Sequence, residues 1–445
     1  MKSYIKLGKK LFPIYRSITG AGVVKTLRIL KKEVKGLKIK HIKSGTKVFD
    51  WKISPEWNVK NAYVKDKNGK KIIDFKKNNL HLVSYSKPIN RFVTKKKLIK
   101  HLHFLKKQKK AIPYVTSYYK KYWGFCLSYN DYKKLIKNYK DNEKFFVKIK
   151  SKFKNNGKLH YGELLIKGKE EEEILISTNI CHPAMANNEL SGPLVAIALA
   201  KYFKKSRKIN KSIRFLFLPE TIGSIAYIKF NLNKLKENVI GGYTLTCIGD
   251  NRNYSYLLSK YKNSPSDIAA LKACRQLKLK FKKYSYLKSE SDERRYNAPF
   301  VNLGIGSIMR TKYHSFPEYH TSLDNFKLVT AEGLRGGFNL VQKAIKNLDK
   351  IYLKNNSGTV VRAKKKKSLI CKTVCEPNLG KRNLYPLLSK KDNEFKSPHK
   401  ILDFLQFADG TNNLIDISNY INCSLVETRS ILKILLKQKL VAFTK

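Results

Sequence analysis

The feature that most constrains the fold is a buried strand that leads through a polar loop into an apolar helix. Residues 173–177 (Glu-Ile-Leu-Ile-Ser) predict the strand, and residues 194–203 predict the helix. The loop between them carries His182 and Glu189. In an α/β protein, the loop beyond the carboxyl end of a strand is a usual place for a functional site. We therefore expect an α/β domain whose chemistry lies at such loops.

The central part of the chain repeats the alternation of strand, loop and helix. Strands are predicted at residues 163–166, 173–177, 213–218, 242–248 and 300–305. Helical patterns lie at residues 267–274 and 333–345. This alternation predicts an α/β fold class, a doubly wound, mostly parallel sheet with helices on both faces.

The pattern changes at both ends of this core. Residues 1–35 include a helical pattern at 22–31 and are assigned to the core, which continues over residues 116–353. Residues 36–115 show short alternating runs and an Asn-Gly turn at residues 68–69, which predict a small inserted β domain.

A basic stretch around residues 354–368 is interpreted as a linker to a last domain, residues 365–445. This domain is predicted to be a winged helix-turn-helix, because several helices precede a short terminal strand. The predicted helices are residues 401–407, 414–421 and 425–436, and the strand is residues 440–443.

The net charge of the chain is extreme, at +61 from 93 Lys and Arg against 32 Asp and Glu. Affinity for nucleic acid or an anionic membrane surface is one interpretation. The other is a lysine-rich composition without a binding role, which is favoured because the lysines are spread along the chain and the run Lys364–Lys367 is short.

The seven cysteines do not suggest a disulfide framework. The start of the chain has no sustained apolar stretch, and nothing approaches the ~18 apolar residues of a membrane span. We therefore expect no membrane span and a cytoplasmic location.

The candidate chemistry lies in loops that follow strands. Imidazole and carboxylate groups such as His182 and Glu189 are typical zinc ligands, although a Glu at a helix start also stabilises the helix. Glu220 follows the strand at 213–218 and is a candidate general base of a metal-assisted hydrolysis, or alternatively a helix-start carboxylate. His320 has hydroxyl and carboxylate neighbours that suit a ligating ring, or a hydrogen-bonded structural one.

Charged residues of both signs precede the strand predicted at 300–305. Asp292, Glu293 and Arg294 could hold a charged end of a substrate, since Arg binds carboxylates in a bidentate way, or they could form a surface ion-pair loop. No Gly-rich phosphate loop and no Gly-x-Ser-x-Gly motif is present, which leaves nucleotide chemistry and serine hydrolysis without a motif.

The motifs follow one another in a characteristic order, which resembles the zinc-dependent aminopeptidase superfamily. The motifs are His182, Asn-Asn-Glu-Leu-Ser-Gly at 187–192, Glu-Thr-Ile-Gly at 220–223, Ser-Asp-Glu at 291–293 and Tyr-His-Thr-Ser-Leu-Asp at 319–324. The likeness is to a bacterial subgroup of aminopeptidase-like proteins, often associated with polysaccharide-biosynthesis loci. That subgroup joins a peptidase core to an inserted β domain and a C-terminal winged helix.

The resemblance implies roles for individual residues. Two-zinc aminopeptidases use carboxylates where this chain has Asn188, Thr221 and Thr246, so one zinc ion is expected rather than two. The resemblance implies His182, Glu189 and His320 as its ligands and Glu220 as the general base. Asp292, Glu293, Arg294 and Tyr319 are the predicted substrate-binding residues.

The expected function is hydrolysis of a small amide or amino-acyl substrate by one zinc ion and a Glu base. The alternative is a regulatory, DNA-binding protein that reads bases with Glu427, Thr428 and Arg429 of the third C-terminal helix. An apolar helix of this kind more often packs or dimerises, so self-association through the C-terminal domain is also expected.

Overall fold

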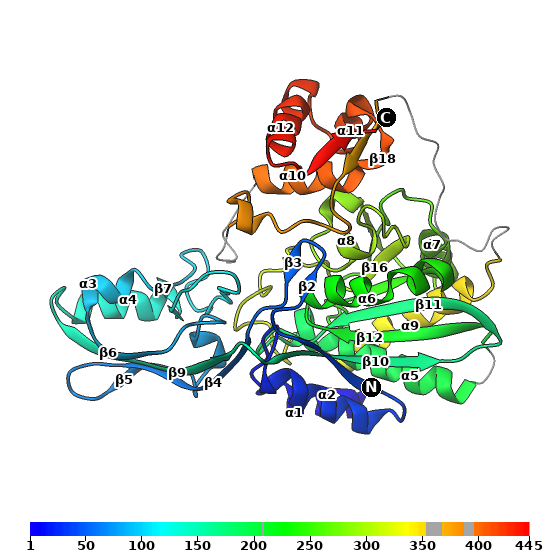
Figure 1. Ribbon diagram of the computed structural model, residues 1–445. Coiled ribbons are helices and arrows are strands. Elements are labelled where there is room, and N and C mark those ends of the chain that lie inside the picture. The colour runs from blue at the N-terminus through cyan, green and yellow to red at the C-terminus, as the bar shows by residue number, and fades with distance from the viewer. Residues whose placement is uncertain (207–208, 353–366, 387–395, 445) are drawn as a thin grey trace.

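A mixed eight-stranded sheet forms the centre of the protein (Figure 1). The computed structural model describes residues 1–206, 209–352, 367–386 and 396–444. The sheet has the strand order β1-β10-β12-β11-β13-β16-β14-β15. Its strands are β1 (Lys38–Lys43), β10 (Lys158–Ile166), β11 (Glu170–Asn179), β12 (Lys211–Leu218), β13 (Val239–Leu245), β14 (Ser255–Leu257), β15 (Lys282–Tyr284) and β16 (Ile305–Met309).

The middle of the sheet is parallel, since β11 pairs with β12 and β13 in parallel and β13 pairs with β16 in the same way. Strand β11 places Ile174 and Ile176 in one apolar cluster and Leu175 in another, so both faces of the strand are covered. One face packs against helices α1 (Lys2–Leu11), α2 (Ala21–Glu33), α5 (Ser191–Ser206), α7 (Pro265–Gln276) and α9 (Ala331–Leu348). Helix α6 (Ile222–Asn238) and the short α8 (Glu293–Tyr296) cover the other face. The predicted doubly wound α/β class is confirmed.

A smaller sheet with the order β5-β4-β9-β6 projects to one side of the core (Figure 1). Its strands are β4 (Glu56–Lys65), β5 (Lys71–Asp74), β6 (Ile89–Thr94) and β9 (Lys144–Lys154), and helices α3 (Lys95–Ile99) and α4 (Tyr129–Asn138) lie in the same part. The sheet therefore extends past the boundary predicted at residue 115, because β9 pairs with both β4 and β6. Strand β1 pairs with β10, so residues 38–43 belong to the central sheet.

Two short strand pairs complete the inserted part. Strands β2 (Lys47–Val48) and β3 (Trp51–Lys52) form an antiparallel hairpin that reaches toward the C-terminal part (Figure 1). Strands β7 (Leu102–His103) and β8 (Phe125–Cys126) pair in parallel.

The C-terminal part has the predicted winged-helix pattern. Its helices are α10 (Lys396–Phe407), α11 (Leu414–Tyr420) and α12 (Leu425–Lys437), and its sheet joins β17 (Leu369–Cys371), β18 (Asp409–Asn412) and β19 (Val441–Phe443). The predicted linker at 354–368 lies outside the described residues, apart from Lys367 and Ser368.

The strand predicted at 300–305 begins only at Ile305, where β16 starts. Phe300, Asn302 and Gly304 have φ angles of 66°, 46° and 63°, so the backbone turns repeatedly before the strand. Among the described helices, none is both long and apolar enough to cross a membrane.

Candidate active site

A cavity of about 240 Å³ lies where the core, the inserted part and the C-terminal part meet. The core contributes His182, Glu220 and His320 to its lining. The inserted part contributes aromatic side chains, namely Trp51, Tyr114, Tyr118 and Tyr119. The C-terminal part contributes Glu376, Tyr385, His399 and Leu402, among others.

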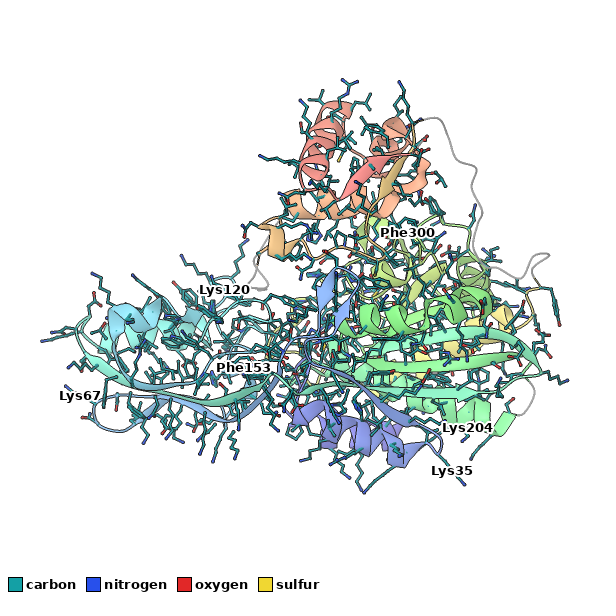
Figure 2. All side chains as sticks on the ribbon, in the orientation of Figure 1. Lys35, Lys67, Lys120, Phe153, Lys204 and Phe300 are labelled. Carbon is teal, nitrogen blue, oxygen red and sulfur yellow. The ribbon has the colours of Figure 1, made fainter. Side chains whose placement is uncertain are left out.

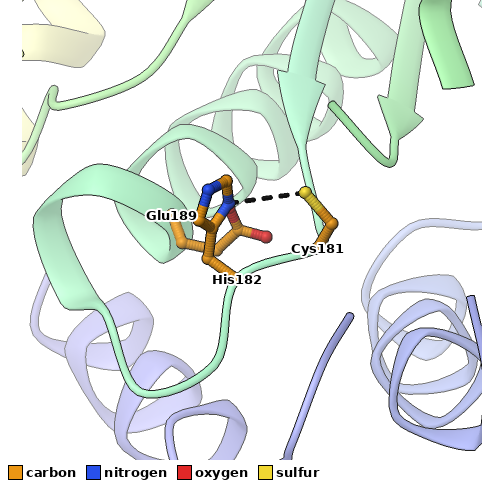
Figure 3. A group of neighbouring side chains, drawn as sticks. All are labelled: Cys181, His182 and Glu189. Carbon is orange, nitrogen blue, oxygen red and sulfur yellow. Dashed lines mark hydrogen bonds and ion pairs between the residues drawn. The ribbon is translucent and has the colours of Figure 1, made fainter. Parts of the chain in front are cut away.

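His182 is held from behind by a buried carboxylate. Its Nδ1 lies 2.7 Å from Oε2 of Glu189, and its backbone oxygen accepts a 3.0 Å hydrogen bond from Nε of the buried Arg16. Cys181, His182 and Glu189 form one tight group in Figure 3, with potential ligand atoms within 4.8 Å of one another. Burial lowers the pKa of His182, but the adjacent Cys181 and Glu189 raise this pKa well above its usual value.

The other ring nitrogen of His182 faces a second carboxylate. Nε2 lies 3.6 Å from Oε2 of Glu220. Because Nδ1 and Nε2 lie on different edges of the ring, Glu189 occupies one edge and Glu220 the other. An imidazole that donates one N–H to a carboxylate is oriented to ligate a metal with its other nitrogen. Glu189 is thus placed to support the ring, and Nε2 is the nitrogen on the cavity side.

Glu220 follows β12, and its side chain is fixed by hydrogen bonds from the end of β11 and from a loop residue. Its Oε1 accepts a 3.1 Å bond from Asn179 Nδ2 and a further hydrogen bond from Ser291 Oγ. The next residue, Thr221, has a φ of 63° and a ψ of −73°, which is a strained conformation for a β-branched residue. The strain at this turn is typical of a functional position.

Asp292 holds this turn in place. Its Oδ1 accepts hydrogen bonds of 2.8 Å from the Thr221 backbone N–H and from Ser224 Oγ. Burial, together with the negative charge of Glu220, raises the pKa of Asp292 to about 7. Asp292 is buried behind the cavity lining, so it acts on Glu220 through the turn.

His320 shares the cavity with His182. Their ring centroids are 5.4 Å apart, with an angle of 36° between the ring planes. Zinc–nitrogen bonds of 2.0–2.1 Å in a tetrahedral site place two ligating imidazole centroids about 5 Å apart. The ring of Tyr319 stacks on that of His320 at 3.9 Å. The backbone N–H of Tyr114 donates a 2.9 Å hydrogen bond to the backbone oxygen of His320. The spacing of the two rings therefore matches a shared coordination sphere.

A buried aspartate connects the loops that carry these residues. Asp324 lies four residues after His320 and accepts backbone hydrogen bonds from Asn187 at 2.6 Å and Asn188 at 2.9 Å. Burial raises the pKa of Asp324 to about 7. This contact fixes the loop of His320 against the loop of Glu189.

The positions that would hold a second ion are not acidic. Thr246 donates a 2.7 Å hydrogen bond to the backbone oxygen of Asn188, and Thr221 forms the turn described above. Asn188 Oδ1 and Glu189 Oε1 are buried without a hydrogen-bond partner in the described part of the chain. The imidazoles of His182 and His320, which both line the cavity, are donors of the kind that zinc uses, so the side chains present at the cavity fit a zinc ion.

The residues predicted to bind substrate are mostly engaged elsewhere. Glu293 is fully buried and accepts hydrogen bonds from Tyr313 and Ser307, among other donors, and Tyr319 packs on His320. Arg294 lines the cavity but forms ion pairs with Glu376 at 2.7 Å and Asp403 at 2.9 Å. The structure thus brings His182, Glu220, His320 and Arg294 to the cavity and leaves Asp292, Glu293 and Tyr319 behind its lining.

Sequence reasoning did not identify the wall contributed by distant segments. Glu376 pairs with Arg294 and Arg295, and its backbone oxygen accepts a 2.8 Å hydrogen bond from Trp51 Nε1. No local pattern marks Glu376 as part of a site. The aromatic segment at 111–120 was visible in the sequence, but its place beside the two histidines depends on the fold.

Family comparisons agree with this architecture. Residues 5–351 match a family described as a domain of unknown function (DUF4910), and residues 368–443 match a winged helix-turn-helix family. The chain is 40% identical over 410 residues to a Clostridium acetobutylicum protein, a candidate polysaccharide biosynthesis protein with an aminopeptidase-like domain. The match covers 92% of this chain and 89% of that protein.

Solved structures show the same fold. A crystal structure of a candidate peptidase from Clostridium acetobutylicum has 36% sequence identity and a TM-score of 0.74, and covers 100% of this chain and 96% of that chain. A zinc aminopeptidase from Bacillus subtilis matches at 13% identity with a TM-score of 0.56, over 77% of this chain and 93% of that chain. A peptidase M28 precursor from Shewanella amazonensis matches at 12% identity and a TM-score of 0.54, over 80% of this chain and 95% of that chain.

Proposed function

The chain belongs to the DUF4910 family of proteins with an aminopeptidase-like domain, and we propose that it is a zinc-dependent hydrolase of small amide or amino-acyl substrates. The aminopeptidase fold supports a peptidase-like hydrolase. The observation that carries the proposal is the convergence of His182, His320 and Glu220 on one cavity.

In this proposal, His182 and His320 hold a single zinc ion. When bound, zinc polarises a carbonyl group and makes a water molecule more acidic. Glu189 keeps the ring of His182 oriented through Nδ1. Direct ligation by Glu189, which the sequence resemblance implied, stays a prediction that a Glu189 variant tests.

Glu220 is the proposed general base. Its Oε1 is held by Asn179 and Ser291, which leaves Oε2 on the side of His182 Nε2. From this position the carboxylate can accept a proton from an attacking water and deliver it to the leaving amine. Asp292 fixes the turn that carries Glu220 and is a positioning residue.

The size and cover of the cavity support a small substrate. A volume of about 240 Å³ with walls from all parts of the molecule leaves little room for a folded polypeptide. Arg294 and Arg295 give one wall positive charge, although Glu376 pairs with both.

The test is hydrolysis of a panel of amino-acyl amides with and without a chelator. We expect chelation to abolish the activity and added zinc to restore it. Glu220→Gln should lower kcat at least a hundredfold while the protein still binds zinc, since removal of a general base costs about 10²–10⁴ in rate. Glu237→Gln, an exposed position near the end of α6, is the matched control and should be as active as the parent. Equal activity of Glu220→Gln and the parent would reject the proposed role.

The DNA-binding alternative gains no specific support. Of its predicted base readers, Glu427 pairs with Lys400, Thr428 is buried, and Arg429 is exposed. Leu425 and Val426 expose apolar surface on the same helix. Self-association through this helix stays a prediction. The geometry supports another role for the C-terminal part, which is to close the cavity.

A further inference from the structure

A second, larger cavity adjoins the candidate active site. It has a volume of about 760 Å³ and lies between the β2–β3 hairpin and the inserted sheet. Tyr118 and Tyr119 line both cavities, so the two are separated by one short segment of chain. Lys120 and Phe153 from its lining are labelled in Figure 2, where the inserted part joins the core.

The lining of this cavity is positively charged. It includes Lys52, Lys87, Lys120 and Lys121 but no Asp or Glu. All these lysines are exposed, and in the described part of the chain none of their ammonium groups forms an ion pair. Like charges around one concavity raise the local positive potential and attract anions.

Aromatic side chains pack between the two cavities. Tyr114 contacts the rings of His182 and His320 at centroid distances of 5.0 and 5.4 Å, and its hydroxyl lies 2.7 Å from that of Tyr118. Tyr118 contacts Tyr85 at 5.2 Å.

The last rings of this series line the lysine-lined cavity. Tyr85 contacts Phe153 at 5.9 Å, and both line that cavity. Phe153 is 37% exposed, so its ring is accessible to a ligand. The faces and edges of such rings suit a ring-bearing ligand, and the surrounding ammonium groups suit an anion attached to it.

We propose that this cavity is a subsite for an anionic group, phosphate or carboxylate, carried on a ring-bearing part of the substrate. The amide to be cleaved would then lie beside His182 and Glu220, and the rest of the substrate would extend past Tyr118 and Tyr119, which line both cavities. This inference rests on the proposed function for the position of the amide, but binding of the anion does not require catalysis.

The experiment measures binding by isothermal titration calorimetry at fixed, low salt. The probes are inorganic pyrophosphate, digalacturonate as a carboxylated ring, and cellobiose as a neutral ring. The variant Lys120→Glu/Lys121→Glu should weaken binding of at least one anionic probe tenfold or more. The matched control Lys96→Glu/Lys97→Glu changes the same charge on exposed α3 residues and should stay within twofold of the parent.

Further arms separate this inference from the proposed function. His182→Ala, which removes a proposed zinc ligand, should bind the anionic probe as the parent does. Lys52→Ala/Lys87→Ala should also weaken binding, and unchanged circular dichroism would show that each variant folds. Binding of either anion that depends on the cavity lysines supports the subsite. The proposal is overturned if neither anion binds, if the α3 control weakens binding equally, or if cellobiose binds as well as the anions.

Discussion

At the scale of single residues, the proposed zinc site depends on how His182 is held. The buried carboxylate of Glu189 occupies Nδ1, and Nε2 faces Glu220 and the cavity. The two carboxylates therefore have separate places, one behind the ring and one in front of it. Supporting partners of ligating histidines affect metal affinity less than the ligands do.

This arrangement predicts different zinc affinities for two variants. Glu189→Gln keeps an oxygen near Nδ1 and should weaken zinc binding about 10–100-fold. His182→Ala removes a ligand and should weaken it further. Competition against a chromophoric chelator measures both constants. If Glu189→Gln loses zinc as completely as His182→Ala, then Glu189 ligates the metal directly.

Asp324 predicts a pH dependence of stability. Burial raises the pKa of this carboxyl from 3.8 to about 7, so the folded state binds its proton more tightly than the unfolded state does. The stabilisation is present in full below the unfolded pKa and is lost as pH rises through about 7. The shift corresponds to at most about 4 kcal/mol.

Urea unfolding of the parent and of Asp324→Asn between pH 4 and 8 tests this sign. The variant lacks the titrating group, so the stability of the parent relative to the variant should fall with rising pH. A difference that stays constant or grows with pH would contradict the assignment.

At the scale of secondary-structure elements, buried ion pairs attach the C-terminal part to the core. Arg294 in α8 forms ion pairs with Glu376 and with Asp403, which lies in α10. Gln406 Nε2 donates a 3.2 Å hydrogen bond to the backbone oxygen of Arg294. Arg295 also pairs with Glu376. Removal of one member of such a network leaves buried charge without its partner.

Glu376→Ala should therefore lower the free energy of unfolding by about 3–5 kcal/mol. Glu171→Ala is the control, because the Glu171 side chain is 87% exposed and its pair with Lys167 is on the surface. That change should cost less than about 1 kcal/mol. Equal effects of the two substitutions, measured by chemical denaturation, would show that the Glu376 network does not stabilise the protein.

Many elements could be predicted from the sequence because their patterns are local. Strands such as β11 and β12 are apolar on both faces, and α5 is apolar along most of its length, so each is recognisable alone. The strand predicted at 300–305 starts later in the structure, because Phe300 and Asn302 have positive φ angles that a regular strand does not contain. The apolar residues among 300–305 resemble a strand in the sequence and do not reveal these turns. The two histidines and Glu220 could be predicted as site residues because they lie in loops that follow strands. Glu376 and Trp51 reach the cavity only through tertiary packing, which no local pattern shows.

At the scale of the whole molecule, the C-terminal part acts as a wall of the site. One apolar cluster joins Tyr286, Met309 and Phe316 of the core to Leu369 and Phe404 of the C-terminal part. Figure 1 shows this part resting on the core above α8. A winged helix that binds DNA as an independent module would not need to share its core in this way.

A chain ending at residue 352 should consequently be much less stable than the full chain. It would expose the apolar cluster and leave Arg294 and Arg295 without Glu376. We expect a large fall in melting temperature by calorimetry, together with loss of zinc binding. If the truncated protein had the same melting temperature as the full chain, the C-terminal part would be an independent module.

We propose that two imidazoles from distant loops, His182 and His320, bind one zinc ion at the cavity. This zinc site can be measured by X-ray absorption at the zinc edge on the zinc-loaded full chain, with metal content determined on the same sample. We expect one zinc per chain, multiple scattering from two imidazoles, only nitrogen and oxygen ligands, and loss of one imidazole in His320→Ala. A sulfur ligand would instead place the ion at Cys181. A sulfur ligand, a zinc–zinc vector or the absence of stoichiometric zinc would each rule out a single zinc ion held by His182 and His320.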